Sequence, residues 1–128
     1  MNNMISKELL SKILGFEVSG FCLALNETFI EVYDDSRDER ISIYESAFEC
    51  KKWAFLKWYD IETSIDSLGL DENGNPIYVG YAFLSSMKDK EHIIDRNKYI
   101  KEFEANSEPE AVFKACEWIL ENQNKGQE

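Results

Sequence analysis

Apolar residues recur at helical spacing in three parts of the chain, and this pattern predicts three helices. Residues 5–14 form the first, which Ser6 caps and Gly15 ends. The second begins at Ser42, because Ser42 and Glu45 match a capping box. Its expected core-facing stripe is Tyr44, Ala47, Phe48, Phe55 and Trp58, widened by Ile43, Cys50 and Ala54.

The third predicted helix lies near the end of the chain, in the segment SEPEAVFKACEWILEN at residues 107–122. Ser107 and Glu110 match a second capping box, and Pro109 fits the first turn because no N–H partner is needed there. Its expected inner stripe is Val112, Ala115, Cys116 and Ile119, widened by Phe113 and Leu120. Folding explains both cap and stripe, so we interpret this segment as a packing helix.

Apolar and polar residues alternate elsewhere and predict two hairpins. In residues 21–33, a turn at Asn26 and Glu27 places one set of apolar residues on a single face: Phe21, Leu23, Leu25, Ile30 and Val32. Asn73 and Gly74 give the clearest turn signal in the chain, because both accept positive φ. Gly69 marks an expected bulge in the strand before that turn. On the returning strand, one face is expected to hold Ile77, Val79, Tyr81 and Phe83.

The remaining segments complete the predicted architecture. Residues 34–40 are interpreted as a charged loop, 86–98 fit either a loop or a short helix, and 99–105 alternate as a fifth strand. Tight hairpins imply antiparallel pairing. The predicted class is therefore α+β, in the order α-β-β-α-β-β-β-α, with a single mostly antiparallel sheet of about five strands and two or three helices packed on it. Residues 1–128 are expected to form one domain with a frayed tail from about residue 122.

Composition narrows the possible partners. The chain has 128 residues, of which 44% are hydrophobic, enough for a core. Its 25 acidic and 14 basic residues give a formal net charge of -11, which repels nucleic acid and anionic membranes and attracts basic surfaces. We find no signal peptide and no apolar run of membrane-spanning length. Three widely spaced cysteines match neither a disulfide framework nor a zinc site, so we expect a cytoplasmic protein with reduced thiols.

No segment carries a recognisable catalytic or metal-binding motif. His92 is the only histidine and lies in a charged segment. Cys22, Cys50 and Cys116 are interpreted as core residues rather than nucleophiles. Residues 71–76, DENGNP, imitate the opening of a calcium loop, but a proline replaces the required glycine and the final glutamate is missing. The sequence therefore predicts a protein without catalytic residues, metal or cofactor.

The distribution of charge is the feature most suggestive of function. No lysine or arginine occurs between Lys12 and Arg37, or between Lys57 and Lys88, and both stretches fall in the predicted hairpins. The candidate binding residues there are Glu31, Asp34, Asp35, Glu62 and Asp66. Two interpretations remain open. The acidic residues either aid solubility or form a docking surface that imitates nucleic acid.

Two blocks, ISIYESAFECKKWA at residues 41–54 and EAVFKACEWILEN at 110–122, resemble small proteins encoded by phages and prophages. They are similar to the family called the phage ABA sandwich domain. The resemblance covers about a third of the chain and consists mostly of helix caps and core residues. It implies an α/β sandwich and a viral setting, and it implies no catalytic residues.

These observations favour a non-enzymatic, acidic binding protein of phage type. The specific hypothesis is an inhibitor of a host defence system, of the anti-CRISPR kind, acting on a host protein with a basic surface in the bacterial cytoplasm. One alternative is a binder or sponge for a small nucleotide-like ligand, for which the candidate residues are Lys88, Lys90, Arg96 and Lys98. Another is a structural or assembly protein of a prophage that forms a homodimer through its aromatic second helix.

Overall fold

The structure is a computed structural model that describes residues 4–24, 28–34, 38–87 and 98–126. Within these residues the chain forms three helices and two three-stranded antiparallel sheets. The helices are α1 (Lys7–Leu14), α2 (Ile43–Leu56) and α4 (Glu108–Gly126). The first sheet contains β1 (Gly20–Ala24), β2 (Phe29–Tyr33) and β3 (Asp38–Ser42), and the second β4 (Tyr59–Leu70), β5 (Pro76–Ser86) and β6 (Lys98–Ala105).

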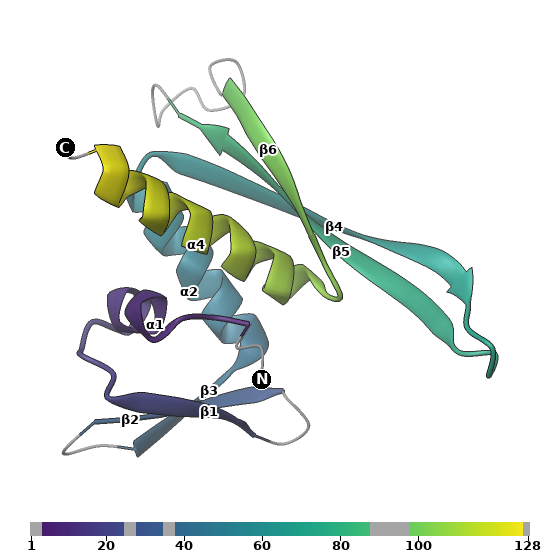
Figure 1. The fold of residues 1–128 in the computed structure, drawn as a ribbon, viewed down its shortest axis with the longest axis horizontal. Coiled ribbons are helices and arrows are strands. Elements are labelled where there is room, and N and C mark those ends of the chain that lie inside the picture. The colour runs from purple at the N-terminus through teal and green to yellow at the C-terminus, as the bar shows by residue number, and fades with distance from the viewer. Residues whose placement is uncertain (1–3, 25–27, 35–37, 88–97, 127–128) are drawn as a thin grey trace.

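The α+β class is confirmed, but the prediction of a single sheet of about five strands is wrong. The helices lie between the two sheets, with β1–β3 on one side and β4–β6 on the other (Figure 1). The difference arises at residues 38–42, of which 38–40 were predicted to belong to a charged loop. They form β3, which pairs with β2 and runs directly into α2 at Ser42. The helix then separates this small sheet from the strands that follow.

The predicted caps form as expected. The Ser6 hydroxyl accepts a hydrogen bond from the backbone N–H of Leu9 at 3.0 Å, and Gly15 ends α1 with a φ of 80°. The Ser42 hydroxyl accepts from the N–H of Glu45 at 3.0 Å. Such caps satisfy N–H groups that have no partner within the helix, and each stabilises by about 1 kcal/mol.

Helix α4 occupies the centre of the molecule and contacts β4, β5, β6, α1 and α2. The predicted inner stripe is confirmed, because all of its members are buried: Val112, Phe113, Ala115, Cys116, Ile119 and Leu120. Strand β5 passes directly beneath the start of this helix. A Cβ atom placed on Gly80 would lie 2.2 Å from the backbone carbonyl carbon of Ser107, so only glycine fits there.

The predicted inward face of α2 is confirmed only in part. Ile43, Ala47, Cys50 and Ala54 are buried as expected, together with Ser46 and Trp53, which were not expected there. Tyr44 and Phe48, however, are 73% and 60% exposed, and Phe55 is half-buried. Most of the buried residues are small, because α2 packs against α4 and close helix packing leaves little room for large side chains. The large aromatic residues are therefore left on the outer side.

The same effect determines which face of β5 packs towards α4. Its core side carries Gly80, Ala82 and Leu84, while Tyr81 and Phe83 lie half-exposed on the opposite side. In β6, Phe103 and Ala105 face the core, but Tyr99 is 58% exposed. A register shift opposite Leu84 and Ser85 moves Tyr99 out of alternation with the rest of the strand.

Candidate docking surfaces

The outer face of the second sheet combines carboxylates with aromatic rings. Residues paired directly across antiparallel strands project to the same side of a sheet. On the side away from the helices, these paired rows are Asp60–Ser85–Tyr99, Glu62–Phe83–Glu102, Ser64–Tyr81–Glu104 and Asp66–Val79. None of the residues in these four rows is lysine or arginine, whereas Lys98 and Lys101 of β6 pair with Ser86 and Leu84 outside them. We call Asp60, Glu62, Asp66, Glu102 and Glu104, together with Tyr81 and Phe83, the acidic sheet face.

Two aromatic rings form the middle of the acidic sheet face. The rings of Tyr81 and Phe83 stack with a centroid distance of 6.1 Å and an interplanar angle of 23°. The pKa of Tyr81 is raised by loss of solvent around its hydroxyl and, next, by the negative charges of Glu104, Asp66 and Glu102. The carboxylates thus act on the same small area as the aromatic pair.

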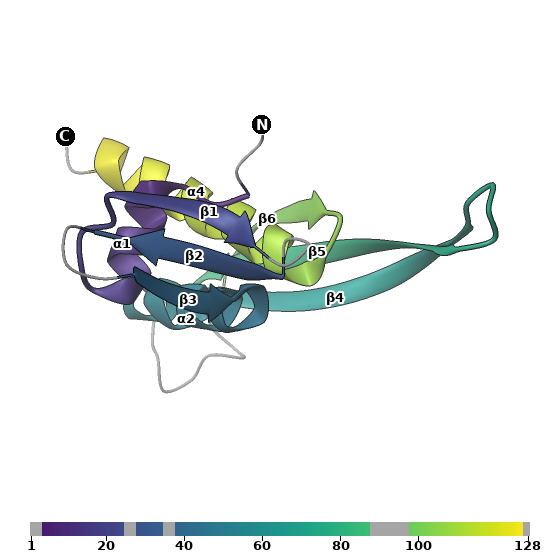
Figure 2. The same ribbon diagram turned by 90° about the horizontal axis from the view of Figure 1, so that it is seen from below.

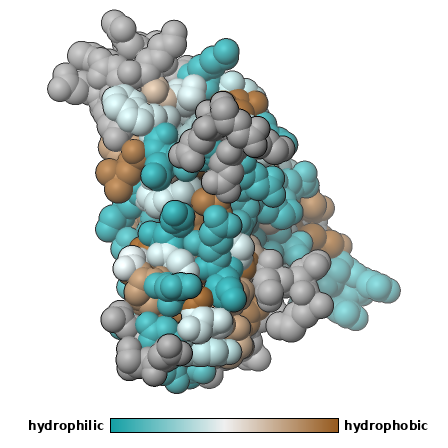
Figure 3. All heavy atoms as spheres, turned by 60° about the vertical axis from the view of Figure 1, so that its left-hand side comes forward, coloured by the Kyte–Doolittle hydropathy of each residue, from teal (hydrophilic) through white to brown (hydrophobic). Residues whose placement is uncertain are grey.

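The hairpin of β4 and β5 continues beyond this face as a free arm. Strand β5 pairs with β6 only from Gly80 onwards, so residues 66–79 pair only with each other. Figure 2 shows the arm extending past the rest of the molecule. Leu68, Leu70 and Tyr78 are more than half exposed on it. Figure 3 shows its hydrophilic tip projecting from a surface on which hydrophobic residues form separate patches.

Local hydrogen bonds shape the tip of the arm. One side-chain oxygen of Asp71 accepts from the backbone N–H groups of Asn73 and Asn75, both at 2.9 Å. Gly74 has a φ of 82°, and the predicted turn is confirmed. The bulge at Gly69 is also confirmed, since the register shifts between Ser67 and Gly69 and the φ of Gly69 is 111°. These hydrogen bonds and backbone angles account for the tight turn at the tip.

The first hairpin places its acidic residues elsewhere. Glu31 lies on the outer face of the first sheet, between Cys22 and Arg40 on the neighbouring strands. Its carboxylate forms a salt bridge of 3.1 Å with the Arg40 guanidinium, so its charge is compensated. Asp34 is half-buried after β2, and Asp35 lies outside the described residues. The two sheets lie on opposite sides of the helices, so the predicted acidic residues do not form one surface (Figure 1).

Sequence reasoning found Glu62 and Asp66 but missed Asp60, Glu102 and Glu104 as parts of this surface. Glu102 and Glu104 were missed because their part of the sequence also contains lysines, at positions 98, 101 and 114, and so does not stand out as acidic. Alternation in residues 99–105 was the signal that could have placed them on one face. Of the residues suggested for a nucleotide-like ligand, Lys98 is exposed at the start of β6. Lys88, Lys90, Arg96 and also His92 lie outside the described residues.

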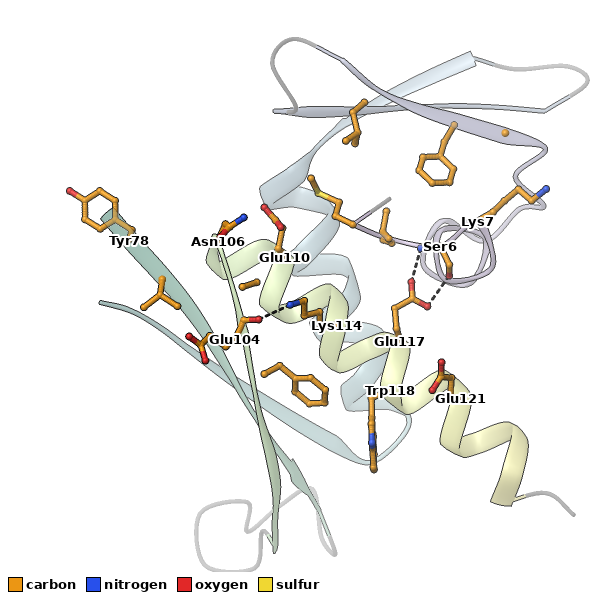
Figure 4. Close-up of a pocket in the computed structure, with 18 of the residues that line it drawn as sticks. Ser6, Lys7, Tyr78, Glu104, Asn106, Glu110, Lys114, Glu117, Trp118 and Glu121 are labelled. Atoms are coloured by element: carbon orange, nitrogen blue, oxygen red, sulfur yellow. Dashed lines mark hydrogen bonds between the residues drawn. The ribbon is translucent and has the colours of Figure 1, made fainter. Parts of the chain in front are cut away.

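A broad groove runs between α1, β1, α4 and the inner side of β5 and β6 (Figure 4). Its volume is about 1640 Å³, above the roughly 300–1,000 Å³ typical of small-molecule sites. Its charged lining residues are Lys7, Glu110, Lys114, Glu117 and Glu121, and Glu104 borders it with its backbone. The carboxylates outnumber the ammonium groups, and the Lys114 ammonium donates to the backbone oxygen of Glu104 at 2.7 Å. This lining disfavours an anionic nucleotide.

Glu117, at the wall of the groove, has a structural role. Its carboxylate accepts hydrogen bonds from the backbone N–H of Ser6 at 2.6 Å and from the Ser6 hydroxyl at 2.9 Å. Partial burial raises the pKa of Glu117, and the two hydrogen bonds from Ser6 act in the opposite direction without cancelling that effect. Glu117 thereby fastens the start of α1 to α4.

The cysteines differ from the prediction in one case. Cys50 and Cys116 are buried between α2 and α4, where the Cys116 thiol donates to the Cys50 backbone oxygen at 3.5 Å. Burial, followed by the neighbouring Cys116, raises the pKa of the Cys50 thiol, which opposes thiolate formation. Cys22 is exposed on the outer face of the first sheet, so its assignment to the core was wrong. Its strand partner Glu31 faces away from the helices, and Cys22 follows it.

The described residues include no group of three histidine, cysteine, aspartate or glutamate side chains arranged to hold a metal ion. None of their helices has the length and apolar character needed to cross a bilayer. Comparisons of the chain with protein-family models, curated proteins and solved structures find no match.

Proposed function

We propose that this protein is a non-enzymatic binding protein that docks onto a basic surface of another protein through its acidic sheet face. The observation that carries the proposal is the set of four paired rows on the outer side of the second sheet, where carboxylates surround a half-exposed aromatic pair and no residue of these rows is cationic. Protein interfaces commonly combine aromatic anchors with a polar rim. Here the rim has one sign of charge, which selects a partner rich in lysine or arginine.

The arm adds apolar contact area beside this charge. Ile77 is 39% exposed and continues the outer side of β5 beyond Val79, whereas the exposed Leu68 and Tyr78 line the groove on the inner side of the arm. A two-stranded hairpin gains little stability from exposing such residues, and contact with a partner would bury them. The partner that fits is a protein with a cationic groove flanked by apolar residues. A groove that binds nucleic acid has this chemistry.

The specific form of the proposal is an inhibitor of a host defence system, encoded by a phage and acting in the bacterial cytoplasm. It would occupy the basic groove of a nucleic-acid-binding host protein and exclude the nucleic acid. Small size, a net charge of -11 and an acidic aromatic face support this form. The resemblance of residues 41–54 and 110–122 to phage-encoded proteins supports the viral setting.

The test uses a peptide of alternating arginine and leucine as a model for the basic partner. Titrated into isotopically labelled protein, it should shift the amide resonances of β4–β6 and leave those of β1–β3 in place. The double variant Glu62→Lys and Glu102→Lys should bind the peptide roughly tenfold more weakly or worse. The control variant Glu31→Lys and Asp38→Lys changes the net charge equally but lies on the first sheet.

Equal weakening by both double variants would show that only net charge matters, and the proposed docking face would be wrong. Amide shifts confined to the residues that line the groove would likewise contradict the proposed docking face. The same variants then serve to compare which proteins the chain retains from a bacterial lysate. A partner that binds through the acidic sheet face should be lost with the first double variant, retained with the second, and released by free nucleic acid.

A further inference from the structure

The outer side of α2 exposes a row of large side chains. Tyr44 and Phe48 are 73% and 60% exposed, and Leu56 near the end of the helix is 69% exposed. Tyr44, Phe48 and Phe55 are spaced by four and seven residues, which places them along one line of an α-helix. Figure 2 shows α2 on the opposite side of the helical layer from α4, and no residue of α2 lines the groove. At the far end of the row, Phe55 lies in a small hollow with Asp60 at the start of β4.

Trp58, directly after α2, has an unusual backbone conformation. Its φ is 72°, a left-handed conformation that normally belongs to glycine at the end of a helix. Its side chain is 47% exposed, and its backbone oxygen accepts from the N–H of Met87 at 2.9 Å. The chain therefore keeps a large aromatic residue at a position where glycine would be less strained.

The charges of α2 are arranged in a self-complementary order. Glu45 is in the first turn, and Lys52 follows seven residues later on the same flank of the aromatic row. Lys52 already lies 3.1 Å from Glu49 and 5.4 Å from the centre of the Phe48 ring. A helix that is acidic at its start and basic two turns later matches an antiparallel copy of itself, because each acidic end then faces a basic one.

We propose that two copies of this chain pair through α2 as an antiparallel, twofold-symmetric dimer. Tyr44 and Phe48 of each copy pack across the symmetry axis, and Glu45 of one copy faces Lys52 of the other, twice. With a net charge of -11, two copies repel each other over most of their surfaces. The outer side of α2 carries both signs of charge beside exposed aromatic rings, which favours a second copy over a uniformly basic partner.

This inference does not rest on the proposed function. The dimer uses the outer side of α2, whereas the acidic sheet face lies on the far side of β4–β6 from the helices. Both acidic sheet faces of a dimer remain open. Failure of the dimer would leave the docking proposal intact, and the reverse also holds.

The experiment measures the oligomeric state of the full chain by sedimentation equilibrium from about 1 μM to 1 mM, a range that covers weak and moderate dimers. Wild-type protein should dimerise. Glu45→Lys should weaken dimerisation roughly tenfold or more, because each substitution creates two like-charge contacts in a symmetric dimer. Lys52→Glu should do the same. An equimolar mixture of these two variants should form a heterodimer, and the double variant Glu45→Lys with Lys52→Glu should recover self-association.

The control is Glu8→Lys, because Glu8 occupies the first turn of α1 as Glu45 occupies that of α2, and the change in charge is identical. It should leave the dimer unchanged. Phe48→Ala should also weaken dimerisation while the helix content of the monomer, measured by circular dichroism, stays the same. A wild-type monomer throughout the concentration range would overturn the proposal. So would a dimer that is equally sensitive to Glu8→Lys, or one that the mixed charge variants fail to restore.

Discussion

The two sheets of this molecule treat acidic residues in opposite ways. In the first sheet, Glu31 lies beside Arg40 on β3 and forms a 3.1 Å salt bridge with it. In the second sheet, Glu62 and Glu102 flank Phe83 with no cation in their row. Both sheets come from acidic stretches of sequence. The charge of their outer faces differs because of the third strand that pairs with each hairpin. Strand β3 adds an arginine to the outer face of the first sheet, and β6 adds glutamates to that of the second.

This contrast bears on which surface is functional. A compensated carboxylate contributes to folding and presents little net field to a partner. Carboxylates gathered around an aromatic pair repel one another, and this repulsion lowers the stability of the fold. Proteins tolerate such a loss of stability at surfaces that serve binding. The second sheet is therefore the better candidate for a docking surface, although the first hairpin is equally acidic in sequence. Four further measurements test this difference between the sheets.

The largest expected effect concerns the glycines at which each sheet approaches another part of the chain. Gly80→Ala should destabilise the protein by about 3 kcal/mol or more, because the new methyl group meets the backbone of Ser107 and Glu108 at the start of α4. Gly20→Ala in the first sheet should cost much less, because the nearest atoms belong to the exposed ring of Tyr33, which can turn away. Urea denaturation of both variants measures the difference. Similar losses of stability in the two variants would show that the contact between β5 and α4 is no less adaptable than the contact between Gly20 and Tyr33.

Thiol labelling tests how open the first sheet is on its outer side. Cys22 should react promptly with a thiol reagent under native conditions. Cys50 and Cys116 should react at least about a hundredfold more slowly, because the core must open first and burial disfavours the Cys50 thiolate. Mass spectrometry should find one label in the native chain and three after denaturation. Slow labelling of Cys22 would mean that the outer face of the first sheet is covered.

Neutralising one glutamate in each sheet should change stability in opposite directions. Glu31→Gln removes the salt bridge to Arg40 and should cost about 0.2–1 kcal/mol, the usual range for an exposed pair. Glu102→Gln removes like-charge repulsion across the second sheet and should stabilise by a few tenths of a kcal/mol. Thermal unfolding at low ionic strength shows both effects most clearly. A loss of stability in both variants would remove the proposed contrast.

The smallest expected effect is on the ionisation of Tyr81. Glu104→Gln should lower the pKa of Tyr81, because Glu104 is the largest charge contribution to its raised value after loss of solvent. Asp66→Asn should lower it less, since its contribution ranks below that of Glu104. Tyrosinate absorbance during an alkaline titration, with a Tyr81→Phe variant to identify the signal, measures both changes. An unchanged pKa of Tyr81 in the Glu104 variant would show that the surrounding carboxylates do not act on the aromatic pair.

The sequence predicted those elements whose signals are local. Ser6, Gly15 and Ser42 act within one turn of their helices, and Asn73 and Gly74 act within one hairpin, so their effects can be recognised without tertiary contacts. Two antiparallel hairpins and the burial of α4 were predicted for the same reason. The arrangement of the strands in two sheets was not, because β3 has the composition of a loop and becomes a strand only by pairing with β2.

Size explains which residues of α2 and β5 are buried. Hydrophobicity favoured Tyr44 and Phe48 in α2 as core residues, and in β5 it did not show which of the two faces is buried. The structure buries Ala47, Cys50 and Ala54, and likewise Gly80 and Ala82, because α4 passes close to both elements. A central helix selects small neighbours and leaves the large aromatic residues outside. The same distances determine the candidate surfaces, which is why the rings that predict a core in the sequence line the proposed interfaces instead.

The bond between Glu117 and Ser6 joins residues 111 positions apart, and it has a consequence for how the protein is made. A ribosome releases α1 and the first sheet long before it releases α4. Until then α1 lacks the carboxylate that holds its first turn, and the surfaces of α2 and β5 that α4 covers stay wet. The segments that are synthesised first therefore depend for their packing on the helix that is synthesised last. Assembly of the core waits for the last helix, and a nascent chain without it should remain sensitive to protease along most of its length.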